Sequence, residues 1–306
     1  MNNLGLIFFY GGRTMYELIS LTNKTYYINS PSKVGLFKIN DKEIYLIDSG
    51  NDKDAARKID KHIKENDWTL KGIINTHSNA DHVGGNKMLQ ARHDCEIIST
   101  SMENSFTKHP VLEPSFLYGG YPFKAIRNKF IMAEASNPTS DIETAGIIGL
   151  SYIKLPGHFF DMIGIITDDK VAFLGDSLFS EEIINKYHIF FIYDIKAYIE
   201  TLNMLDGLEA DIYVPSHCEP TKNIKSLIKA NRNKIEEIVN HILLFCENPR
   251  LFEDILQYIF SVYSLKMDAN QYILVGSTLR SYLSYMSDEN LLTYEFSDSK
   301  MYWKKI

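Results

Sequence analysis

The chain has 306 residues, of which 45% are hydrophobic and 23% carry charge, and its formal net charge is −7. These proportions are those of a globular protein of one or two domains, which excludes extensive disorder and collagen-like or low-complexity classes. The acidic balance disfavours a protein that binds nucleic acid through bulk positive charge, because phosphate contacts need clustered Lys and Arg. Three cysteines, Cys95, Cys218 and Cys246, are too few for a disulfide framework and favour a reducing compartment.

No apolar run is long enough to cross a bilayer as a helix, so we expect a cytoplasmic protein with no membrane contact. The apolar run at Leu4–Tyr10 lacks the basic segment and the cleavage site of a signal peptide. We interpret Met15 as the natural first residue, because residues 11–14 can be encoded by a purine-rich stretch that resembles a ribosome-binding site.

The first half of the chain alternates short apolar strands with amphipathic helices, which is typical of an α/β fold. Ala55, Ile59 and Ile63, for example, recur at helical spacing. Strands are expected at Tyr16–Ile19, Thr25–Asn29, Gly35–Ile39, Glu43–Ile47, Gly72–Asn75 and Glu96–Thr100. Helices are expected at Asp54–Asn66 and Asn86–His93.

Residues 101–150 show no clear period and contain several prolines, which predicts a long loop. Their aromatic residues favour an ordered cover over a disordered one, and we expect this cover to select the substrate. Cations that can neutralise an anionic substrate, or simply be solvated, are Lys108, Lys124, Arg127 and Lys129. Tyr118 and Tyr121 are candidates to line the cleft, and Tyr187, His188 and Tyr193 can approach it from the other side, with His188 interpreted as a surface residue.

The second half returns to strands and then becomes helical. Strands are expected at Tyr152–Leu155, Ile163–Thr167, Val171–Leu174 and Ile212–Val214, with a helix at Asp194–Leu205. Further helices are expected at Ile224–Cys246, Leu251–Ser261 and Ala269–Met286, followed by a hairpin of Leu291–Phe296 and Met301–Ile306. Helices followed by a hairpin indicate a winged-helix-like unit, so we place the domains at residues 15–221 and 222–306.

The most informative segment is the loop from His77 to His82, which follows a strand and precedes a helix. Two imidazoles and the carboxylate of Asp81 lie within six residues, a ligand set that suits Zn²⁺ and also iron or manganese. The glycines at 84 and 85 let the backbone pass close to such a site.

Three more candidate ligands follow apolar strands in the same way. They are His158 after Pro156-Gly157, Asp176 after Gly175, and His217 after Pro215-Ser216. A single polar residue at a strand end is commonly a surface residue. Four segments that all place His or Asp there favour one shared metal site.

These segments resemble the signature of the metallo-β-lactamase superfamily of hydrolases over residues 15–221. That signature is His-x-His-x-Asp-His, then a His after Pro-Gly, an Asp in a Gly-Asp pair, and a final His. Asp48-Ser49-Gly50 also resembles the family's Asp-x-Gly, whose Asp supports the ligand loop. The resemblance implies an αββα sandwich with a two-metal cleft at one edge, followed here by the winged-helix-like unit.

The resemblance also implies which residues hold each metal ion. The first position would have His77, Asn79 and His158, and the second would have Asp81, His82 and His217, with Asp176 between the two. Asp48 and Asp161 are candidates to receive the second N–H of a ligating imidazole, and a turn-forming role for Asp161 is equally open. Cys218, directly after His217, is interpreted as a buried, inert thiol.

One position departs from the family pattern, because Asn79 stands where the second His of the signature is expected. An amide oxygen is a poorer Zn²⁺ ligand than imidazole and suits harder ions, so iron or manganese is a candidate at the first position. Three interpretations stay open: an active enzyme with an altered first position, a mononuclear enzyme, and a degenerate protein that binds without catalysis.

The expected function is metal-dependent hydrolysis that uses one or two Zn²⁺ ions, an activated water and Asp81 as the catalytic carboxylate. The resemblance leaves ester, thioester, lactone and phosphoester substrates open, although Asp176 disfavours the lactamase classes that carry Cys at this position. The alternative is a regulatory or nucleic-acid-interacting protein without hydrolase activity. The expected partners are a small-molecule substrate and a second copy of the chain as a homodimer.

Overall fold

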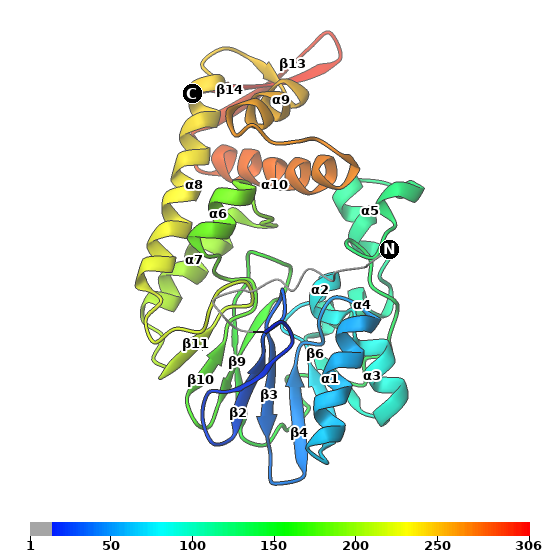
Figure 1. The fold of residues 1–306 in the computed structure, drawn as a ribbon. Helices are drawn as coiled ribbons and strands as arrows, with labels where there is room; N and C mark the ends of the chain where they lie inside the picture. The colour runs from blue at the N-terminus through cyan, green and yellow to red at the C-terminus, as the bar shows by residue number, and fades with distance from the viewer. Residues whose placement is uncertain (1–13) are drawn as a thin grey trace, which may run out of the picture.

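The computed structural model describes residues 14–306, so the apolar run at Leu4–Tyr10 lies outside the described part. Figure 1 shows two facing sheets flanked by helices, with a helical region above them. The first sheet has the order β1-β2-β3-β4-β5-β6-β7, and the second has the order β11-β10-β9-β8. Figure 1 also shows α10 crossing above this sandwich, between α8 and α5.

The first sheet consists of β1 Leu18–Ser20, β2 Thr25–Ile28, β3 Val34–Lys38, β4 Glu43–Ile47, β5 Thr69–Ile74, β6 Glu96–Ser99 and β7 Ser140–Asp141. The second consists of β8 Leu150–Lys154, β9 Ile163–Thr167, β10 Val171–Phe173 and β11 Ile212–Val214. The helices of this part are α1 Lys53–Glu65, α2 Ala80–Val83, α3 Asn86–His93, α4 Ser101–Lys108, α5 Leu112–Tyr118, α6 Glu181–Tyr187 and α7 Ile195–Asp206, with a 3₁₀ turn at Lys124–Ile126.

Alternating side chains explain the layers, because successive residues of a strand point to opposite faces of the sheet. In β3, Phe37 belongs to the core between the two sheets, where it meets Phe173 of β10. Its neighbour Leu36 points to the other face and packs with Ile59 of α1 and Leu89 of α3. Helices therefore cover the outer face of the first sheet, and the αββα arrangement that the resemblance implied is confirmed.

Residues 101–150 differ from the expected loop, because their first part forms α4, α5 and the 3₁₀ turn. These helices are short, so each offers too few turns for its period to be recognised in the sequence. Leu117 of α5 packs with Ile126, Ile131 and Ile273, and this contact joins the cover to α10. Helix α6 was also not expected.

The C-terminal region contains α8 Lys225–Phe245, α9 Phe252–Val262 and α10 Ala269–Asp288, with a sheet of β12 Arg250–Leu251, β13 Leu292–Ser297 and β14 Lys300–Lys305. The expected helices and hairpin are present, and β12 adds a third strand by pairing with β14. The winged-helix assignment stays a prediction. So does the boundary near residue 221, because one hydrophobic cluster runs from Leu155 through Tyr198 to Leu279 without interruption.

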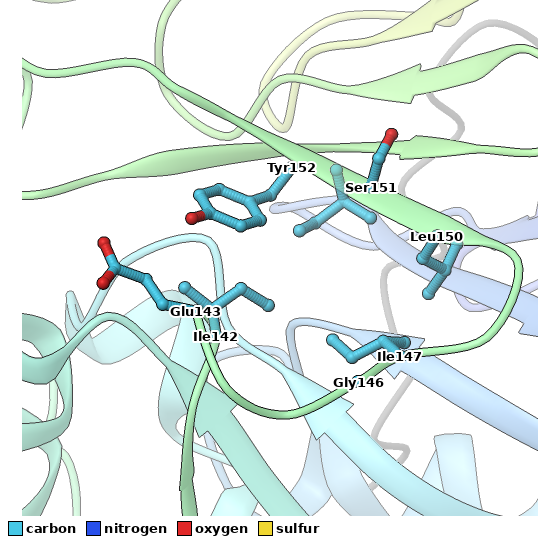
Figure 2. A pocket seen from close by; sticks show the side chains of 8 residues that line it. Ile142, Glu143, Gly146, Ile147, Leu150, Ser151 and Tyr152 are labelled. Atoms are coloured by element: carbon cyan, nitrogen blue, oxygen red, sulfur yellow. The ribbon is translucent and has the colours of Figure 1, made fainter.

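A small cavity of about 320 Å³ lies between the loop that contains Ile142 and Ile147 and strand β8 (Figure 2). Glu143 is the one charged residue among the eight that line this cavity, and none of the eight is a predicted metal ligand. This cavity is therefore not the candidate site.

We expect Gly157→Ala to destabilise the metal-free protein by about 2 kcal/mol or more, measured by urea denaturation. Gly157 has φ 120°, and an added Cβ would lie 2.3 Å from the backbone nitrogen of Tyr198 in α7. Gly146→Ala is the matched control, because Gly146 also has positive φ but has nothing within 4 Å of the added Cβ. It should cost only about 1 kcal/mol, and equal losses in the two variants would contradict this interpretation.

Candidate metal centre

The four segments that carry predicted ligands meet at one edge of the sandwich. The loop from His77 to His82 follows β5, and His158 follows β8. Asp176 and His217 follow β10 and β11, which are parallel neighbours with Phe173 opposite Val214. Because the carboxyl ends of parallel strands lie at the same edge of a sheet, the last two side chains are brought together.

Asp176 lies at the centre of the group. Its carboxylate oxygens are 3.1 Å from His217 Nε2, 3.2 Å from His82 Nε2 and 3.7 Å from His158 Nε2. Asp81 lies on the more open side, with its Oδ2 3.4 Å from His217 Nε2 and 3.5 Å from His82 Nε2. The structure thus brings together all of the residues predicted from the four segments.

Each of the four imidazoles is held through Nδ1, so that Nε2 faces the centre. His82 Nδ1 contacts Asp48 at 2.8 Å, and His77 Nδ1 contacts the hydroxyl of Thr76 at 3.0 Å. His158 Nδ1 lies 2.9 Å from the Phe191 carbonyl oxygen, and His217 Nδ1 lies 3.1 Å from that of Pro31. Metal-binding histidines are commonly oriented in this way by a second partner.

Asp48 supports the ligand loop as expected, and Asp161 does not support His158. Asp48 is 2% exposed, and its carboxylate also accepts hydrogen bonds from the backbone N–H and the hydroxyl of Thr76. The partner of His158 is instead the Phe191 carbonyl, while the backbone N–H of Asp161 donates to Glu103.

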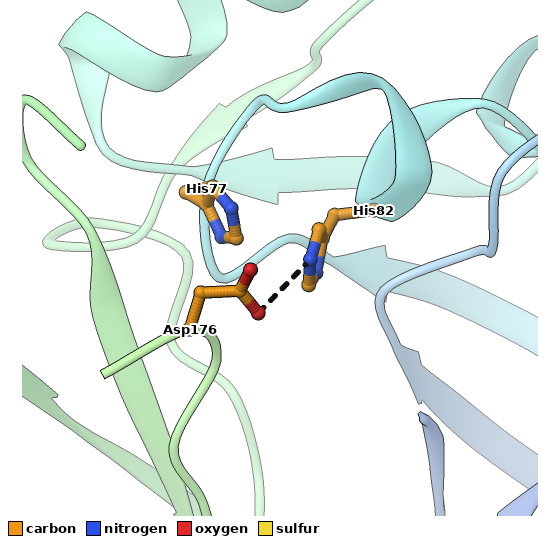
Figure 3. A group of neighbouring side chains, drawn as sticks. All are labelled: His77, His82 and Asp176. Atoms are coloured by element: carbon orange, nitrogen blue, oxygen red, sulfur yellow. Dashed lines mark ion pairs between the residues drawn. The ribbon is translucent and has the colours of Figure 1, made fainter. Parts of the chain in front are cut away.

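The buried polar atoms of this group fit a cation. His77 Nε2 is buried without a hydrogen-bond partner in the described part of the chain, and the buried His82 Nε2 and Asp176 Oδ1 face each other as an ion pair at 3.2 Å. Figure 3 shows both imidazoles next to the Asp176 carboxylate, with the ion pair between His82 and Asp176 drawn as a dashed line. One ligand atom from each of these three residues lies within 4.8 Å of the others, and the same holds for Asp81, His82 and His217. Imidazole nitrogens and carboxylate oxygens are the donors that Zn²⁺, iron and manganese accept.

The acid–base properties of the group reflect its negative charge. Burial lowers the pKa of His82, but the carboxylates of Asp81, Asp176 and Asp48 outweigh burial and raise that pKa well above its usual value. For His217 burial is likewise outweighed by Asp176 and Asp81, which raise its pKa to about 10. Burial and the neighbouring His82 lower the pKa of His77 well below its usual value. The neighbouring carboxylates thus favour the positively charged form of His82 and His217.

Asn79 does not face open space. Its Oδ1 lies 3.0 Å from His158 Nε2, and its Nδ2 donates to Glu113 Oε1 at 2.8 Å. Glu113 comes from α5 and is 7% exposed. Burial and the charges of Asp81 and Glu103 raise its pKa well above the usual range.

Glu103, from α4, holds the same loops together. Its carboxylate accepts from the backbone N–H and the hydroxyl of Ser78 and from the N–H of Asp161. Burial raises the pKa of Glu103 to about 7. The sequence analysis did not find Glu103 or Glu113. The sequence offered no clear signal for them, because α4 and α5 are too short for a helical period that would place these carboxylates on a buried face.

A cavity of about 980 Å³ opens onto the metal centre and extends toward α6, α8 and α10. Asn79, Asp81, His158, Asp176 and His217 line it together with Glu113. Its apolar lining includes Phe130, Ile131, Phe179, Ile183, Tyr187, Ile189, Phe190, Phe191, Leu227 and Leu274.

Most of the expected substrate contacts lie elsewhere. The residues proposed for substrate selection that do not line the cavity are Lys108, Tyr118, Tyr121, Lys124, Arg127, Lys129, His188 and Tyr193. Tyr121 is 75% exposed and hydrogen-bonds Arg127, and the His188 ring stacks on Tyr263 at 4.6 Å. Cys218 does line the cavity, and burial raises its pKa to about 12, so it remains a thiol.

The chain belongs to the metallo-beta-lactamase superfamily, whose family model matches residues 29–217, more than half of its length. Among curated proteins it is similar to a hydroxyacylglutathione hydrolase of Brucella anthropi, with 30% identity over 143 residues, 46% of this chain and 46% of the relative. Hydroxyacylglutathione hydrolase GloC of Haemophilus influenzae is 29% identical over 140 residues, 45% of this chain and 63% of the relative. The match thus spans about half of the first relative and less than two thirds of the second.

Two solved structures are similar over nearly the whole chain. A beta-lactamase domain protein from Burkholderia ambifaria has a TM-score of 0.71 at 14% identity and covers 95% of this chain and 94% of its own. A metallo-beta-lactamase family protein from Thermus thermophilus has a TM-score of 0.71 at 17% identity and covers 94% and 100%. The predicted family and fold class are therefore confirmed, and the shared fold includes most of the helical C-terminal region.

Within residues 14–306, none of the helices combines the length and apolar character that crossing a bilayer requires.

Asp48→Asn should weaken metal binding by about 10- to 100-fold, measured by competition with a chelator, because it removes the carboxylate that orients His82. Asn also tolerates the left-handed backbone of this position, where φ is 63°. Asp161→Asn is the control, and its affinity should stay within about threefold of the unmodified protein. A larger loss in Asp161→Asn than in Asp48→Asn would contradict this assignment.

Proposed function

We propose that the protein is a metal-dependent hydrolase that cleaves an ester or thioester. The observation that carries this proposal is the orientation of four imidazoles, each held through Nδ1 with Nε2 directed at one buried carboxylate. In the proposed arrangement the first metal position has His77, Asn79 and His158, and the second has Asp81, His82 and His217. Asp176 serves both. Zn²⁺ is the proposed ion, with iron or manganese as the alternative at the first position.

A divalent cation held by these residues would supply a water of lowered pKa and would polarise the carbonyl oxygen of the substrate. The chain's own residues orient that reaction. Asp81 faces the cavity, and its carboxylate is placed to accept a hydrogen bond from the attacking water. The Phe191 and Pro31 carbonyls hold His158 and His217 so that neither ring turns during a reaction cycle.

Two observations favour an acyl substrate over a phosphoester. The relatives from Brucella anthropi and Haemophilus influenzae are named hydroxyacylglutathione hydrolases, and glutathione carries its acyl group as a thioester. The cavity beside the proposed centre is mostly apolar, and its charged lining has Lys33 and Lys186 against Asp81, Glu113, Asp176, Glu182 and Glu219. Such a lining suits an apolar acyl group better than a polyanionic phosphoester.

Proteins loaded separately with zinc, manganese or iron should hydrolyse an acyl thioester, and Asp81→Asn should lower kcat/KM by about 100-fold or more. Chelation should abolish hydrolysis, and return of the same metal should restore it. A bis-phosphodiester assayed in parallel should be cleaved poorly. Preferential cleavage of that compound would favour the phosphodiesterase alternative, and failure of every loaded form on both substrates would favour the non-catalytic interpretation.

Asn79→His should increase the zinc bound per chain at equal free zinc, because imidazole is the better Zn²⁺ ligand. Elemental analysis of this variant beside the unmodified protein measures the difference. Ser78→Ala, next to it in the same loop, controls for general disturbance. Equal zinc contents in Asn79→His and the unmodified protein would contradict the placement of residue 79 at the first position.

A further inference from the structure

Helix α5 inserts a carboxylate beside the one position where this chain departs from its family. Glu113 lies in the first turn of α5, and its Oε1 accepts a hydrogen bond of 2.8 Å from Asn79 Nδ2. The other end of the same amide, Oδ1, lies 3.0 Å from His158 Nε2. Both Asn79 and Glu113 line the large cavity.

The two ends of an amide differ in what they offer to a cation. The carbonyl oxygen has lone pairs, whereas the NH₂ group has only donors. Rotation of the amide by a half-turn exchanges the two at almost no steric cost, so an Asn side chain needs a partner that selects one orientation. A carboxylate oxygen accepts hydrogen bonds, so Glu113 draws the NH₂ end toward α5 and leaves the oxygen facing His158.

We propose that Glu113 is the positioning residue that makes Asn79 an oxygen ligand at the first metal position. This inference rests on the proposed function, because it requires a metal ion at that position. The Glu113 oxygen that accepts this hydrogen bond also polarises the amide and so increases the electron density on Asn79 Oδ1. The resulting ligand set contains a harder donor than a set of three imidazoles would, and it therefore favours manganese or iron.

The packing of α5 explains how Glu113 keeps its place. Leu117, one helical turn later, is buried against Ile126 and Ile131 of the cover and against Ile273 of α10. Glu113 itself is 7% exposed. The cover and the C-terminal region therefore hold the carboxylate against the ligand loop, and the first metal position depends on both.

A double-mutant cycle tests this assignment with metal affinity as the readout. The chelated protein is titrated with Mn²⁺ alone, and the dissociation constant and the number of equivalents bound are measured for each variant. Glu113→Leu should weaken the first position by about 10- to 100-fold and leave the second unchanged. Glu113→Gln, whose amide oxygen can still accept from Asn79, should weaken it less.

In an Asn79→Ala background, Glu113→Leu should change the affinity for Mn²⁺ by less than about threefold, because Glu113 then has no amide to orient. Glu182→Leu is the matched control, since Glu182 is an exposed glutamate of α6 that lines the same cavity. It should leave both positions unchanged. Thermal unfolding of each metal-free variant checks that all of them fold.

Two results overturn the inference while leaving the proposed function intact. The first is that Glu113→Leu binds two equivalents of Mn²⁺ with unchanged affinity. The second is that Glu113→Leu weakens Mn²⁺ binding equally in the presence and in the absence of Asn79, which would make Glu113 a direct ligand or a simple charge. Uptake of only one equivalent by the unmodified protein overturns the inference together with the two-metal form of the proposed function.

Discussion

The buried carboxylate of Asp48 is the constraint on which the candidate site depends. It is almost fully enclosed, and it accepts hydrogen bonds from the backbone and the hydroxyl of Thr76 while contacting His82. A buried polar group so far from water is tolerated only when its hydrogen-bonding capacity is satisfied in this way. The same three contacts fix the start and the end of the ligand loop that follows β5. The candidate ligands from the other three segments lie next to that loop.

The first sheet and the second sheet contribute to one centre because their strand ends meet at one edge. The backbone carbonyl of Thr76 accepts from Ile163 N–H at the start of β9, so the loop after the first sheet is joined directly to the second. Parallel pairing of β10 and β11 then places Asp176 and His217 side by side. A rigid frame of this kind keeps like-charged and polar groups close together, which is what a multivalent cation requires.

Helices α4 and α5 of the cover, together with the C-terminal region, also support the candidate site. Glu103 ties the ligand loop to the segment around Asp161, and Glu113 contacts Asn79. Both carboxylates belong to helices of the cover itself, α4 and α5, and α5 in turn rests on α10. The site therefore differs from the family pattern in more than the replacement of one imidazole by Asn79, because Glu113 contacts the amide that takes its place.

The sequence by itself determined the family, the sandwich and the residues from four segments that meet at its edge. Each of those segments follows an apolar strand within a few residues, and local order along the chain is enough to identify them. Only the tertiary structure decided which groups orient them. Phe191 and Pro31 act through backbone carbonyls, which no side-chain pattern reveals. Asp161, a candidate partner for a ligating imidazole, contributes its backbone N–H to Glu103 instead. Glu103 and Glu113 lie on helices too short to show a clear period, and their contacts with the ligand loop span 25 and 34 residues of chain. Such contacts exist only once the cover is packed, because folding alone brings these distant positions together.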